Sequence, residues 1–450
     1  MGRLFGTDGA RGVAITELTC ELAMNIGKAA AVVLTRHTDH RPKIIVGKDT
    51  RISSDVLESA LCAGICAVGA DVEILGVVPT PAVAYLVKKY NADAGVMISA
   101  SHNSVEYNGI KLFSKDGLKL SDEIESEIEE LILDKPEEIP LKFGTDIGKI
   151  SYSKRAPRDY INYLMRTIDD NLSGLRIAVD CANGSASTTA EDLFIGLGAN
   201  CKFINNNPDG TNINKNCGST HLDELARYVK ENKFHIGVAF DGDADRCLAI
   251  DENGEIVDGD RMLAIFAKML KDRGELENNT LVATVMSNMG LLEFAKKNGI
   301  EIKLTNVGDR YVLEQMLEGG YNLGGEQSGH IIFSDHATTG DGQLCAIQLI
   351  SAMKAADMKL SELASICEVF PQIMINIKIS EYAKGKWQDN DEIKKIIADS
   401  SAELGDDARV LVRESGTEPL IRVMIEGRNF DTINSHALKI AKVIKAHCPK

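Results

Sequence analysis

The stretch Leu175-Arg-Ile-Ala-Val-Asp180 is an apolar strand that a helical segment separates from a second, glycine-led strand, Gly198-Ala-Asn-Cys-Lys-Phe203. The same pattern runs from Lys43 to Ile74 and again from Leu281 to Leu304. A strand, a helix and a strand, with a glycine that closes the helix, are typical of a βαβ unit and favour parallel pairing. The copies are far more widely spaced than the ~20–50 residues of a solenoid repeat. The sequence therefore predicts three similar α/β domains with mixed, largely parallel sheets.

The C-terminal segment has a different pattern, which predicts a smaller α+β domain. Its expected elements are a strand at 372–379, a helix at 391–404, two strands joined by a loop at 409–413 and 419–426, and a helix at 434–445. From these patterns we place the domains at residues 1–147, 148–252, 253–368 and 369–450. Four domains are close to the number expected, about three, for a chain of 450 residues at ~150 residues per domain.

The composition is that of an ordinary globular protein, with 44 % hydrophobic and 26 % charged residues. The chain carries 50 Lys and Arg against 66 Asp and Glu, a formal net charge of −16. An acidic chain repels nucleic acid and anionic membranes, so neither is expected as a partner. An anionic substrate would need a local cluster of positive groups.

The sequence indicates a cytoplasmic protein. The early apolar run Ala29–Leu34 is far shorter than the ~20 residues that a membrane-spanning helix needs. The N-terminal residues lack the apolar segment of a signal peptide. Ten cysteines without zinc-like spacing are then expected to be reduced thiols. Cys62 and Cys66 lie in an alanine-rich, helical stretch and are expected to pack in a core.

The segment Asp241-Gly-Asp-Ala-Asp245-Arg246 follows an apolar strand and carries three carboxylates at alternate positions. Three such groups repel one another unless a cation binds between them, and Mg²⁺ takes oxygen ligands of this kind. An EF-hand loop is disfavoured because Arg246 stands where that loop needs glycine and strands flank the segment. A phosphatase with Asp241 as the nucleophile is a second possibility.

A second motif, Ser99-Ala-Ser101-His102-Asn103, ends another apolar strand. Open α/β sheets bind ligands at this edge, so Ser101 is a candidate nucleophile that His102 could orient. The alternative is a serine that caps a helix. The following Asn108-Gly-Ile-Lys111 is interpreted as a turn that brings a cation near the same edge.

Three further loops have groups suited to a phosphorylated sugar. Gly324-Gly-Glu-Gln-Ser-Gly-His330 offers polar side chains with close backbone approach, although it could be a plain hairpin turn. Arg413-Glu-Ser-Gly-Thr-Glu-Pro419, followed by Arg422, offers hydroxyls, backbone amides and bidentate guanidinium groups for a phosphate. The loop Thr7-Asp-Gly-Ala-Arg11-Gly12 adds another arginine.

These motifs, in this order from Phe5-Gly-Thr-Asp-Gly9 to Arg413–Pro419, resemble the α-D-phosphohexomutase family over nearly the whole chain. The resemblance implies three α/β domains of shared topology and a smaller fourth domain around a central cleft. Gln327, the segment from Asn212-Ile-Asn214 to Cys217-Gly-Ser-Thr-His221, and Gly47-Lys-Asp-Thr-Arg51 are similar to the branch that acts on amino sugars. The implied reaction interconverts glucosamine 6-phosphate and glucosamine 1-phosphate, for UDP-N-acetylglucosamine synthesis.

The resemblance also implies roles for individual residues. Ser101 would be phosphorylated and would hold one Mg²⁺ with Asp241, Asp243 and Asp245. The implied catalytic group further comprises Arg11, His102, Lys111, Arg246 and His330. The implied substrate-binding group is Glu326, Ser328, Arg413, Ser415, Gly416, Thr417 and Arg422. A sugar bisphosphate would be the intermediate and the primer.

Some expectations stay open at this point. Ser104 stands where the family usually has proline, which would alter the restraint on the Ser101 loop. The implied partner is a phosphosugar substrate, and the chain would be a monomer or a homodimer. Mannose or glucose phosphates are alternative substrates, and a magnesium-dependent aspartyl-phosphate phosphatase or a non-catalytic sugar-phosphate sensor are alternative functions.

Overall fold

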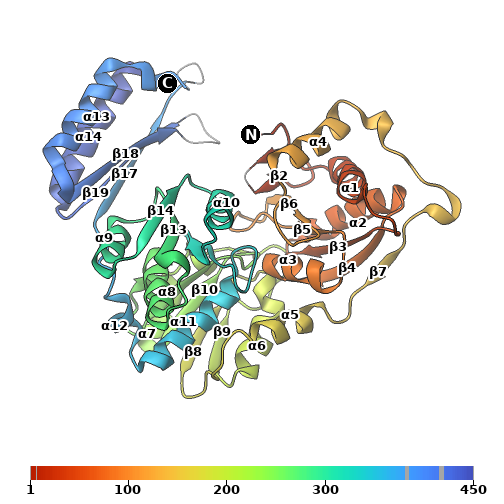
Figure 1. The fold of residues 1–450 in the computed structure, drawn as a ribbon, viewed down its shortest axis with the longest axis horizontal. Helices are drawn as coiled ribbons and strands as arrows, with labels where there is room; N and C mark the ends of the chain where they lie inside the picture. Colours follow the sequence, from red (N-terminus) through yellow and green to blue (C-terminus); the bar gives the residue numbers. More distant parts are fainter. Residues whose placement is uncertain (1, 7, 381–384, 415–419, 449–450) are drawn as a thin grey trace. The chain divides into compact units, whose positions relative to one another are not determined.

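The computed structural model describes residues 2–6, 8–380, 385–414 and 420–448. It divides into two compact units, which Figure 1 draws with their helices and strands labelled. One unit contains residues 1–286 and 299–366, and the other contains residues 287–298 and 367–450. The first three predicted domains therefore pack as one unit, except that residues 287–298 group with the C-terminal segment.

The first sheet has seven strands in the order β1-β2-β6-β5-β3-β4-β7. The strands are β1 (Phe5–Gly6), β2 (Gly9–Val13), β3 (Lys43–Lys48), β4 (Asp71–Val77), β5 (Ala94–Ile98), β6 (Tyr107–Ser114) and β7 (Ile150–Tyr152). β4, β3 and β5 are parallel, and β6 is antiparallel to β5. β7 lies beyond residue 147 yet pairs with β4, so the first sheet extends past the boundary placed there.

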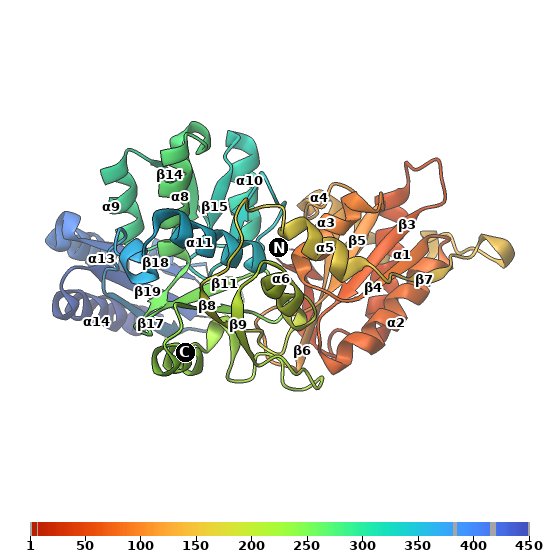
Figure 2. The same cartoon turned by 90° about the horizontal axis from the view of Figure 1, so that it is seen from below.

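Helices cover both faces of this sheet, as Figure 2 shows. They are α1 (Cys20–Thr35), α2 (Ile52–Ala67), α3 (Thr80–Lys89), α4 (Asp122–Leu133) and α5 (Ala156–Leu164). Val46 and Val96 belong to the core that α1 and α2 form. The neighbouring Gly95 points to the other face, where a Cβ would lie only 2.4 Å from Val87 of α3. The alternation of side chains along each strand thus divides the core into two layers.

The second sheet has the strand order β12-β11-β10-β8-β9. Its strands and helices are β8 (Arg176–Asp180), α6 (Ala190–Gly196), β9 (Asn200–Ile204), α7 (Asp223–Asn232), β10 (Ile236–Phe240), β11 (Cys247–Asp251) and β12 (Ile256–Val257). β9, β8 and β10 are parallel, and β11 is antiparallel to β10. The second sheet therefore repeats the central strand pattern of the first.

The third sheet, with the order β14-β13-β15-β16, again has three parallel strands and one antiparallel strand. The elements are α8 (Gly259–Arg273), β13 (Thr280–Thr284), α9 (Met289–Asn298), β14 (Glu301–Thr305), α10 (Asp309–Gly319), β15 (Leu323–Gly325), β16 (Ile331–Phe333), α11 (Gly342–Ala356) and α12 (Leu360–Ala364). The glycine before the second strand of each copy has a positive φ, +96° at Gly69, +80° at Gly198 and +62° at Gly299. This left-handed conformation ends the preceding helix, as the repeated sequence pattern predicts.

The C-terminal segment forms an antiparallel sheet in the order β17-β19-β18. Its elements are β17 (Gln372–Lys378), α13 (Asp391–Leu404), β18 (Ala408–Glu414), β19 (Leu420–Gly427) and α14 (Phe430–His447). Ile393 of α13 and Ile440 of α14 share one core with Val423 and Ile425 of β19. Both helices therefore cover the same face of the sheet. This is the α+β arrangement that the sequence predicts, and the three preceding sheets confirm the α/β class.

Candidate active site

Three of the sequence motifs occupy the same topological position in successive domains. Each lies in the loop between the third parallel strand and the antiparallel strand that follows it. These loops are residues 99–106 between β5 and β6, residues 241–246 between β10 and β11, and residues 326–330 between β15 and β16. The carboxyl end of a parallel strand is the edge at which open α/β sheets bind ligands. The repeated fold thus presents three loops from equivalent edges.

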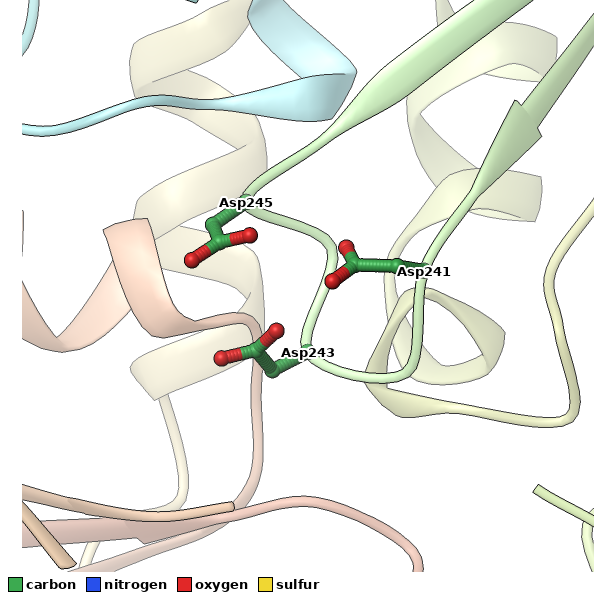
Figure 3. Close-up of side chains that lie close together, drawn as sticks. All are labelled: Asp241, Asp243 and Asp245. Atoms are coloured by element: carbon green, nitrogen blue, oxygen red, sulfur yellow. The ribbon is translucent and has the colours of Figure 1, made fainter. Parts of the chain in front are cut away.

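The loop after β10 brings Asp241, Asp243 and Asp245 together, as Figure 3 shows. One carboxylate oxygen of each lies within 4.8 Å of the others, and all three side chains are buried. Oδ1 of Asp243 and Oδ1 of Asp245 have no hydrogen-bond partner among the described residues. Buried carboxylate oxygens without partners are costly unless a cation binds them. The three side chains therefore fit a divalent metal ion with oxygen ligands.

The three carboxylates differ in their electrostatic surroundings. Burial, together with the charges of Asp245 and Asp243, raises the pKa of Asp241 well above its usual range. Burial also opposes the charge on Asp245, but Lys111 and His330 outweigh it and hold the pKa of Asp245 well below its usual range. Without a cation, Asp245 therefore keeps its charge more readily than Asp241 does.

Ser101 faces this acidic loop from the first domain. Its Oγ donates to Asp241 Oδ2 at 2.6 Å and lies 3.5 Å from His102 Nδ1. Its side chain is buried, and its φ of +53° is a left-handed conformation that is unusual for serine. A hydroxyl in contact with a candidate metal ligand is suited to carry a phosphoryl group there. Ser101 does not cap a helix, so the alternative interpretation of this motif is not supported.

Two cations lie against the acidic loop. Lys111 of β6 places its Nζ 2.7 Å from Asp243 Oδ2 and 3.4 Å from Asp245 Oδ2. Despite burial, the surrounding carboxylates raise the pKa of Lys111 well above its usual range, so its ammonium group is charged. Arg246 Nη1 donates to His102 Nδ1 at 3.1 Å. Burial and this guanidinium lower the pKa of His102 to about 4, so His102 is neutral and accepts.

The segment Asn108–Lys111, interpreted from sequence as a turn, lies inside β6 instead. It pairs with β5 on one side and β2 on the other, so the ladders of two neighbours hold it extended. The strand still brings Lys111 to the site. Arg11 of β2 lies beside it, where its Nη1 donates to Ala100 O at 3.4 Å and its Nη2 pairs with Asp8.

Each ring nitrogen of His330 faces a polar neighbour in this structure. Its Nε2 accepts from the Gly340 amide at 3.0 Å, so the neutral ring carries its proton on Nδ1. Nδ1 in turn lies 3.7 Å from Asp245 Oδ2, and the side chain is buried. The structure brings His330 to the acidic loop, in a position to support Asp245.

Four residues that sequence reasoning did not assign complete the surroundings of the acidic loop. Thr80 donates to Asp243 Oδ2 at 2.5 Å from the start of α3. Asp8 pairs with Lys111 at 3.1 Å and with Lys119 at 2.6 Å. Asp309 of α10 pairs with Lys119 and lies 3.6 Å from His330 Nε2. Asp245 and Lys111 join these residues in a chain of ion pairs, from Asp245 through Lys111, Asp8 and Lys119 to Asp309, that links three domains.

The loop between β15 and β16 holds the candidate sugar-binding residues. Glu326 Oε1 accepts from the Gly308 amide at 3.2 Å, and Ser328 Oγ lies 3.5 Å from Glu326 Oε2. Gln327 Nε2 donates to Asp258 Oδ2 at 3.3 Å. Glu326 and Ser328 are half-buried, so each keeps an accessible part. The motif is a hairpin loop in shape, and its polar groups are available to a ligand.

In the C-terminal unit, two arginines lie directly opposite each other across the β18–β19 ladder. They are Arg413 and Arg422. Burial and the charge of Arg422 lower the pKa of Arg413. Nε of Arg422 is buried without a partner among the described residues. Two cations in this position favour an anion between them. The predicted phosphate-binding residues Ser415, Gly416 and Thr417 lie outside the described residues.

The sequence matches four family models in chain order. They are the phosphoglucomutase/phosphomannomutase α/β/α domains I, II and III, at residues 2–138, 158–254 and 258–370, and the C-terminal domain of the same family at residues 374–443. The chain belongs to this family of phosphohexomutases. It is therefore an enzyme, an isomerase-type phosphotransferase, and the resemblance stated from the motifs is confirmed.

Close relatives share one activity name. A phosphoglucosamine mutase of Ruminiclostridium cellulolyticum is 56 % identical over 445 residues, 99 % of each chain. A phosphoglucosamine mutase of Clostridium perfringens is 55 % identical over 448 residues, 100 % of each chain.

Solved structures share the fold at lower identity. A phosphoglucomutase/phosphomannomutase family protein of Burkholderia thailandensis has a TM-score of 0.82 at 24 % identity, covering 99 % of this chain and 98 % of its own. An N-acetylphosphoglucosamine mutase of Aspergillus fumigatus, solved with GlcNAc-6P and magnesium, has a TM-score of 0.70 at 17 % identity, covering 99 % and 96 %. Among the described residues, no helix is both long and apolar enough to cross a membrane.

Proposed function

We propose that this enzyme interconverts glucosamine 6-phosphate and glucosamine 1-phosphate through a phosphoserine at Ser101 and a sugar bisphosphate. The observation that carries the proposal is the 2.6 Å contact between Ser101 Oγ and Asp241 inside a buried acidic cluster. Family membership and the shared name of relatives at 55–56 % identity support the substrate. They also favour a mutase over a phosphatase with an aspartyl nucleophile.

The proposed transfer breaks the bond between phosphorus and Ser101 Oγ and forms a bond from phosphorus to a sugar hydroxyl oxygen. The hydroxyl proton leaves to a nearby base, and the reverse transfer from the other end of the sugar regenerates phosphoserine. Such transfers depend on positioning and on neutralising charge more than on covalent chemistry. Lys111 and Arg246 would stabilise the moving phosphoryl group, and Arg11 lies beside them.

One Mg²⁺ is the proposed cofactor, held by Asp241, Asp243, Asp245 and phosphorylated Ser101. When bound, this ion would withdraw charge from the transferring phosphoryl group. The unpartnered oxygens of Asp243 and Asp245 support its place there. His102 would support Ser101 and His330 would support Asp245, since Nδ1 of His102 lies 3.5 Å from Ser101 Oγ and Nδ1 of His330 lies 3.7 Å from Asp245 Oδ2.

The substrate's other phosphate would bind at Arg413, Arg422 and the segment Ser415–Thr417. Glu326 and Ser328 would bind sugar hydroxyls. Because the two phosphates of a bisphosphate are alike, one cradle can accept either end after the intermediate turns over. A sugar 1,6-bisphosphate would prime the enzyme by phosphorylating Ser101. The proposed location is the cytoplasm, which fits ten free cysteines, and the proposed assembly is a monomer or a homodimer.

The test compares turnover of glucosamine, mannose and glucose phosphates with the full chain, Mg²⁺ and glucose 1,6-bisphosphate. We expect a strong preference for the glucosamine phosphates and a phosphate on Ser101 in the intact protein by mass spectrometry. Ser101→Ala should abolish turnover, whereas Ser104→Ala, an exposed serine of the same loop, should not. Phosphate on an aspartate, or a preference for mannose phosphate, would overturn the proposal.

A further inference from the structure

The loop that carries Ser101 depends on one buried arginine, Arg51, which precedes α2. The Arg51 side chain has no exposed surface and forms an ion pair with the equally buried Asp49. Its Nε donates to Asp49 Oδ2 at 2.8 Å. Three of its remaining four N–H groups donate to backbone carbonyls of the Ser101 loop, and the fourth donates to the carbonyl of Tyr107, the first residue of β6. Nη1 donates to Ser104 O and, at 3.1 Å, to Tyr107 O, and Nη2 donates to Ser101 O at 3.0 Å and to Asn103 O at 2.7 Å.

Asn214, from the second domain, binds the same loop. Its Nδ2 donates to Ser101 O at 2.8 Å and to Asn103 O at 2.9 Å. Each of these carbonyls therefore receives one N–H from Arg51 and one from Asn214. A carbonyl has two lone pairs, so both acceptors are fully used. The loop lies between an arginine of the first domain and an asparagine of the second.

The Asp49–Arg51 pair also fixes the amide side of Ser101. Asp49 Oδ2 accepts from Ser99 Oγ at 2.7 Å, and Ser99 Oγ accepts from the Ser101 amide at 2.9 Å. The N–H and the C=O of Ser101 are thus both tied to one buried ion pair. A left-handed φ at a residue other than glycine persists when surrounding contacts determine it. Here those contacts hold the conformation in which Oγ reaches Asp241.

We propose that Arg51 and Asn214 are positioning residues for the nucleophile, acting as a clamp on the Ser101 loop. The two sequence segments concerned, Gly47–Arg51 and Asn212–Asn214, have no other assigned role. Ser104 lacks the fixed φ of the proline usual at this position, and the contact of its carbonyl with Arg51 supplies a restraint on the loop. The inference rests on the proposed function, because it assigns Ser101 as the group that is phosphorylated.

The test uses the full chain with Asn214→Asp, Arg51→Lys and the matched control Asn216→Asp. A carboxylate at 214 would repel the two carbonyls that Asn214 now binds, and lysine has three donors where Arg51 uses five. Asn216 lies two residues from Asn214, has a similar φ of +55°, is exposed and forms no side-chain hydrogen bond within the described residues. The control therefore makes the same charge change in the same loop without touching the clamp.

Two readouts separate positioning from binding and from stability. They are kcat and KM for glucosamine phosphates, and the rate at which Ser101 gains phosphate from glucose 1,6-bisphosphate, measured by intact mass. For both clamp variants we expect kcat and the phosphorylation rate to fall about tenfold or more, with KM within about threefold. Asn216→Asp should match the wild type. If Arg51→Lys does not fold, Asn214→Ser, whose hydroxyl cannot reach both carbonyls, provides the second variant.

The clamp is overturned if Asn214→Asp keeps kcat within about twofold of the wild type, if Asn216→Asp loses as much, or if the loss appears in KM alone. The proposed function fails separately, and visibly, if the wild-type protein neither interconverts the sugar phosphates nor gains phosphate on Ser101. A wild type that does both, beside an unimpaired Asn214→Asp, rejects the clamp and leaves the function standing.

Discussion

Arg413 and Arg422 are the residues whose placement most directly indicates an anion. They lie opposite each other on neighbouring strands, and Arg422 has a buried nitrogen without a partner among the described residues. Charge-assisted bonds from a guanidinium to a phosphate contribute about 1.5–3 kcal/mol each. Arg422→Gln should therefore raise KM for glucosamine 6-phosphate about tenfold or more. Steady-state kinetics measure this KM, and a value unchanged from that of the wild type would contradict the prediction.

Lys378→Gln is the matched control for that substitution. Lys378 lies on β17 of the same sheet, its side chain is exposed, and its partner in the ladder is Leu420. Like Arg422→Gln, Lys378→Gln removes one positive charge from this domain, but it leaves both arginines in place. We expect KM to stay within about twofold of the wild type, as usual for a surface charge. An equal rise in both variants would mean that overall charge, not the arginine pair, sets affinity.

Removal of divalent metal tests the acidic loop. The buried, unpartnered oxygens of Asp243 and Asp245 predict that EDTA lowers turnover and that added Mg²⁺ restores it. Asp243→Asn should lower turnover about 100-fold or more at saturating Mg²⁺, because a metal ligand is lost. Asp251→Asn is the control, since Asp251 is also buried but caps a turn through the Asn253 amide. Full activity in EDTA-treated, metal-free protein would contradict the prediction.

For individual residues, the sequence indicates the chemistry of the site but does not identify every residue that takes part in it. Ser101 and the three aspartates stand out because they directly follow apolar strands, at the edge where open α/β sheets bind ligands. Thr80 and Asp309 carry no such signal. Thr80 is 163 residues from its partner Asp243, and Asp309 is 190 residues from its partner Lys119. Contacts between residues so far apart in the sequence depend on how whole domains pack, and a local sequence pattern does not predict that packing.

Among the elements, α11 begins at a buried aspartate whose charge opposes folding. Asp341 accepts from the Leu344 amide at the helix start and from Tyr160 Oη. Burial raises the pKa of Asp341 from 3.8 to about 6. The folded protein therefore holds an extra proton between these values, and its stability falls as the pH rises from 3.8 through about 6. The penalty is complete at about pH 7.5 and shrinks as the pH falls towards about 4.

Asp341→Asn should remove that penalty while keeping the helix cap. Asparagine caps helices as well as aspartate does, and its amide can face Tyr160. We expect a gain of about 2–3 kcal/mol at about pH 7.5 that diminishes towards about pH 4. Thermal melting at both pH values measures it, with the exposed Asp399→Asn as control. A gain of equal size at both pH values would contradict the assigned cause.

The helix α9 is tied to the C-terminal unit by a very close contact. A Cβ at Gly290 would lie 1.6 Å from Glu368 O, and the Met289 amide donates to the buried Glu426 at 3.0 Å. Gly→Ala inside a helix normally stabilises by about 1 kcal/mol. At Gly290 the backbone contact should reverse the sign, so that Gly290→Ala destabilises by about 1–3 kcal/mol.

Gly196→Ala provides the comparison for that substitution. Gly196 is the last residue of α6, and a Cβ there would meet only the flexible end of Met165, at 3.2 Å. It should leave stability unchanged or raise it slightly. Differential scanning calorimetry of both variants measures the effect. Equal melting temperatures for Gly290→Ala and the wild type would show that α9 is free to shift.

Strand and helix positions are the part of the fold that the sequence predicts best. The helix at Asp391–Leu404 has the bounds expected from its periodicity, since an asparagine cap and Gly405 delimit it. The prediction of a turn at Asn108–Lys111 is wrong, because Asn108 and Gly109 pair with β2, and Ile110 and Lys111 pair with β5, so the segment stays extended. Hydrogen bonding to two neighbouring strands outweighs the local preference for a turn, and the sequence of the segment itself does not reveal those strands.

For the whole molecule, repetition explains why chemistry accumulates at one place. Three copies of one strand order each deliver one loop at the same edge, and these loops carry Ser101, the aspartates and Glu326. The sequence predicts the copies but not their packing. It also places α9 in the third domain, whereas residues 287–298 group with the C-terminal unit through Asn288 and Glu426. The contacts that decide this grouping are made by side chains of segments that are distant in the sequence.

The chain of ion pairs that links three domains gives the last prediction. Asp309 of α10 shares Lys119, from the first domain, with Asp8, and its side chain is only 13 % exposed. Asp309→Asn leaves the mostly buried Lys119 with one carboxylate, Asp8, which it shares with Lys111, and this loss should cost about 2 kcal/mol or more. The exposed pair of Lys268 with Asp272 makes Asp272→Asn the contrast, with a cost below about 0.5 kcal/mol. Thermal melting ranks the two, and turnover should fall only for Asp309→Asn, because Asp309 also lies beside His330. Equal losses in both variants would mean that this chain of ion pairs stabilises the packing of the domains no more than a surface pair does.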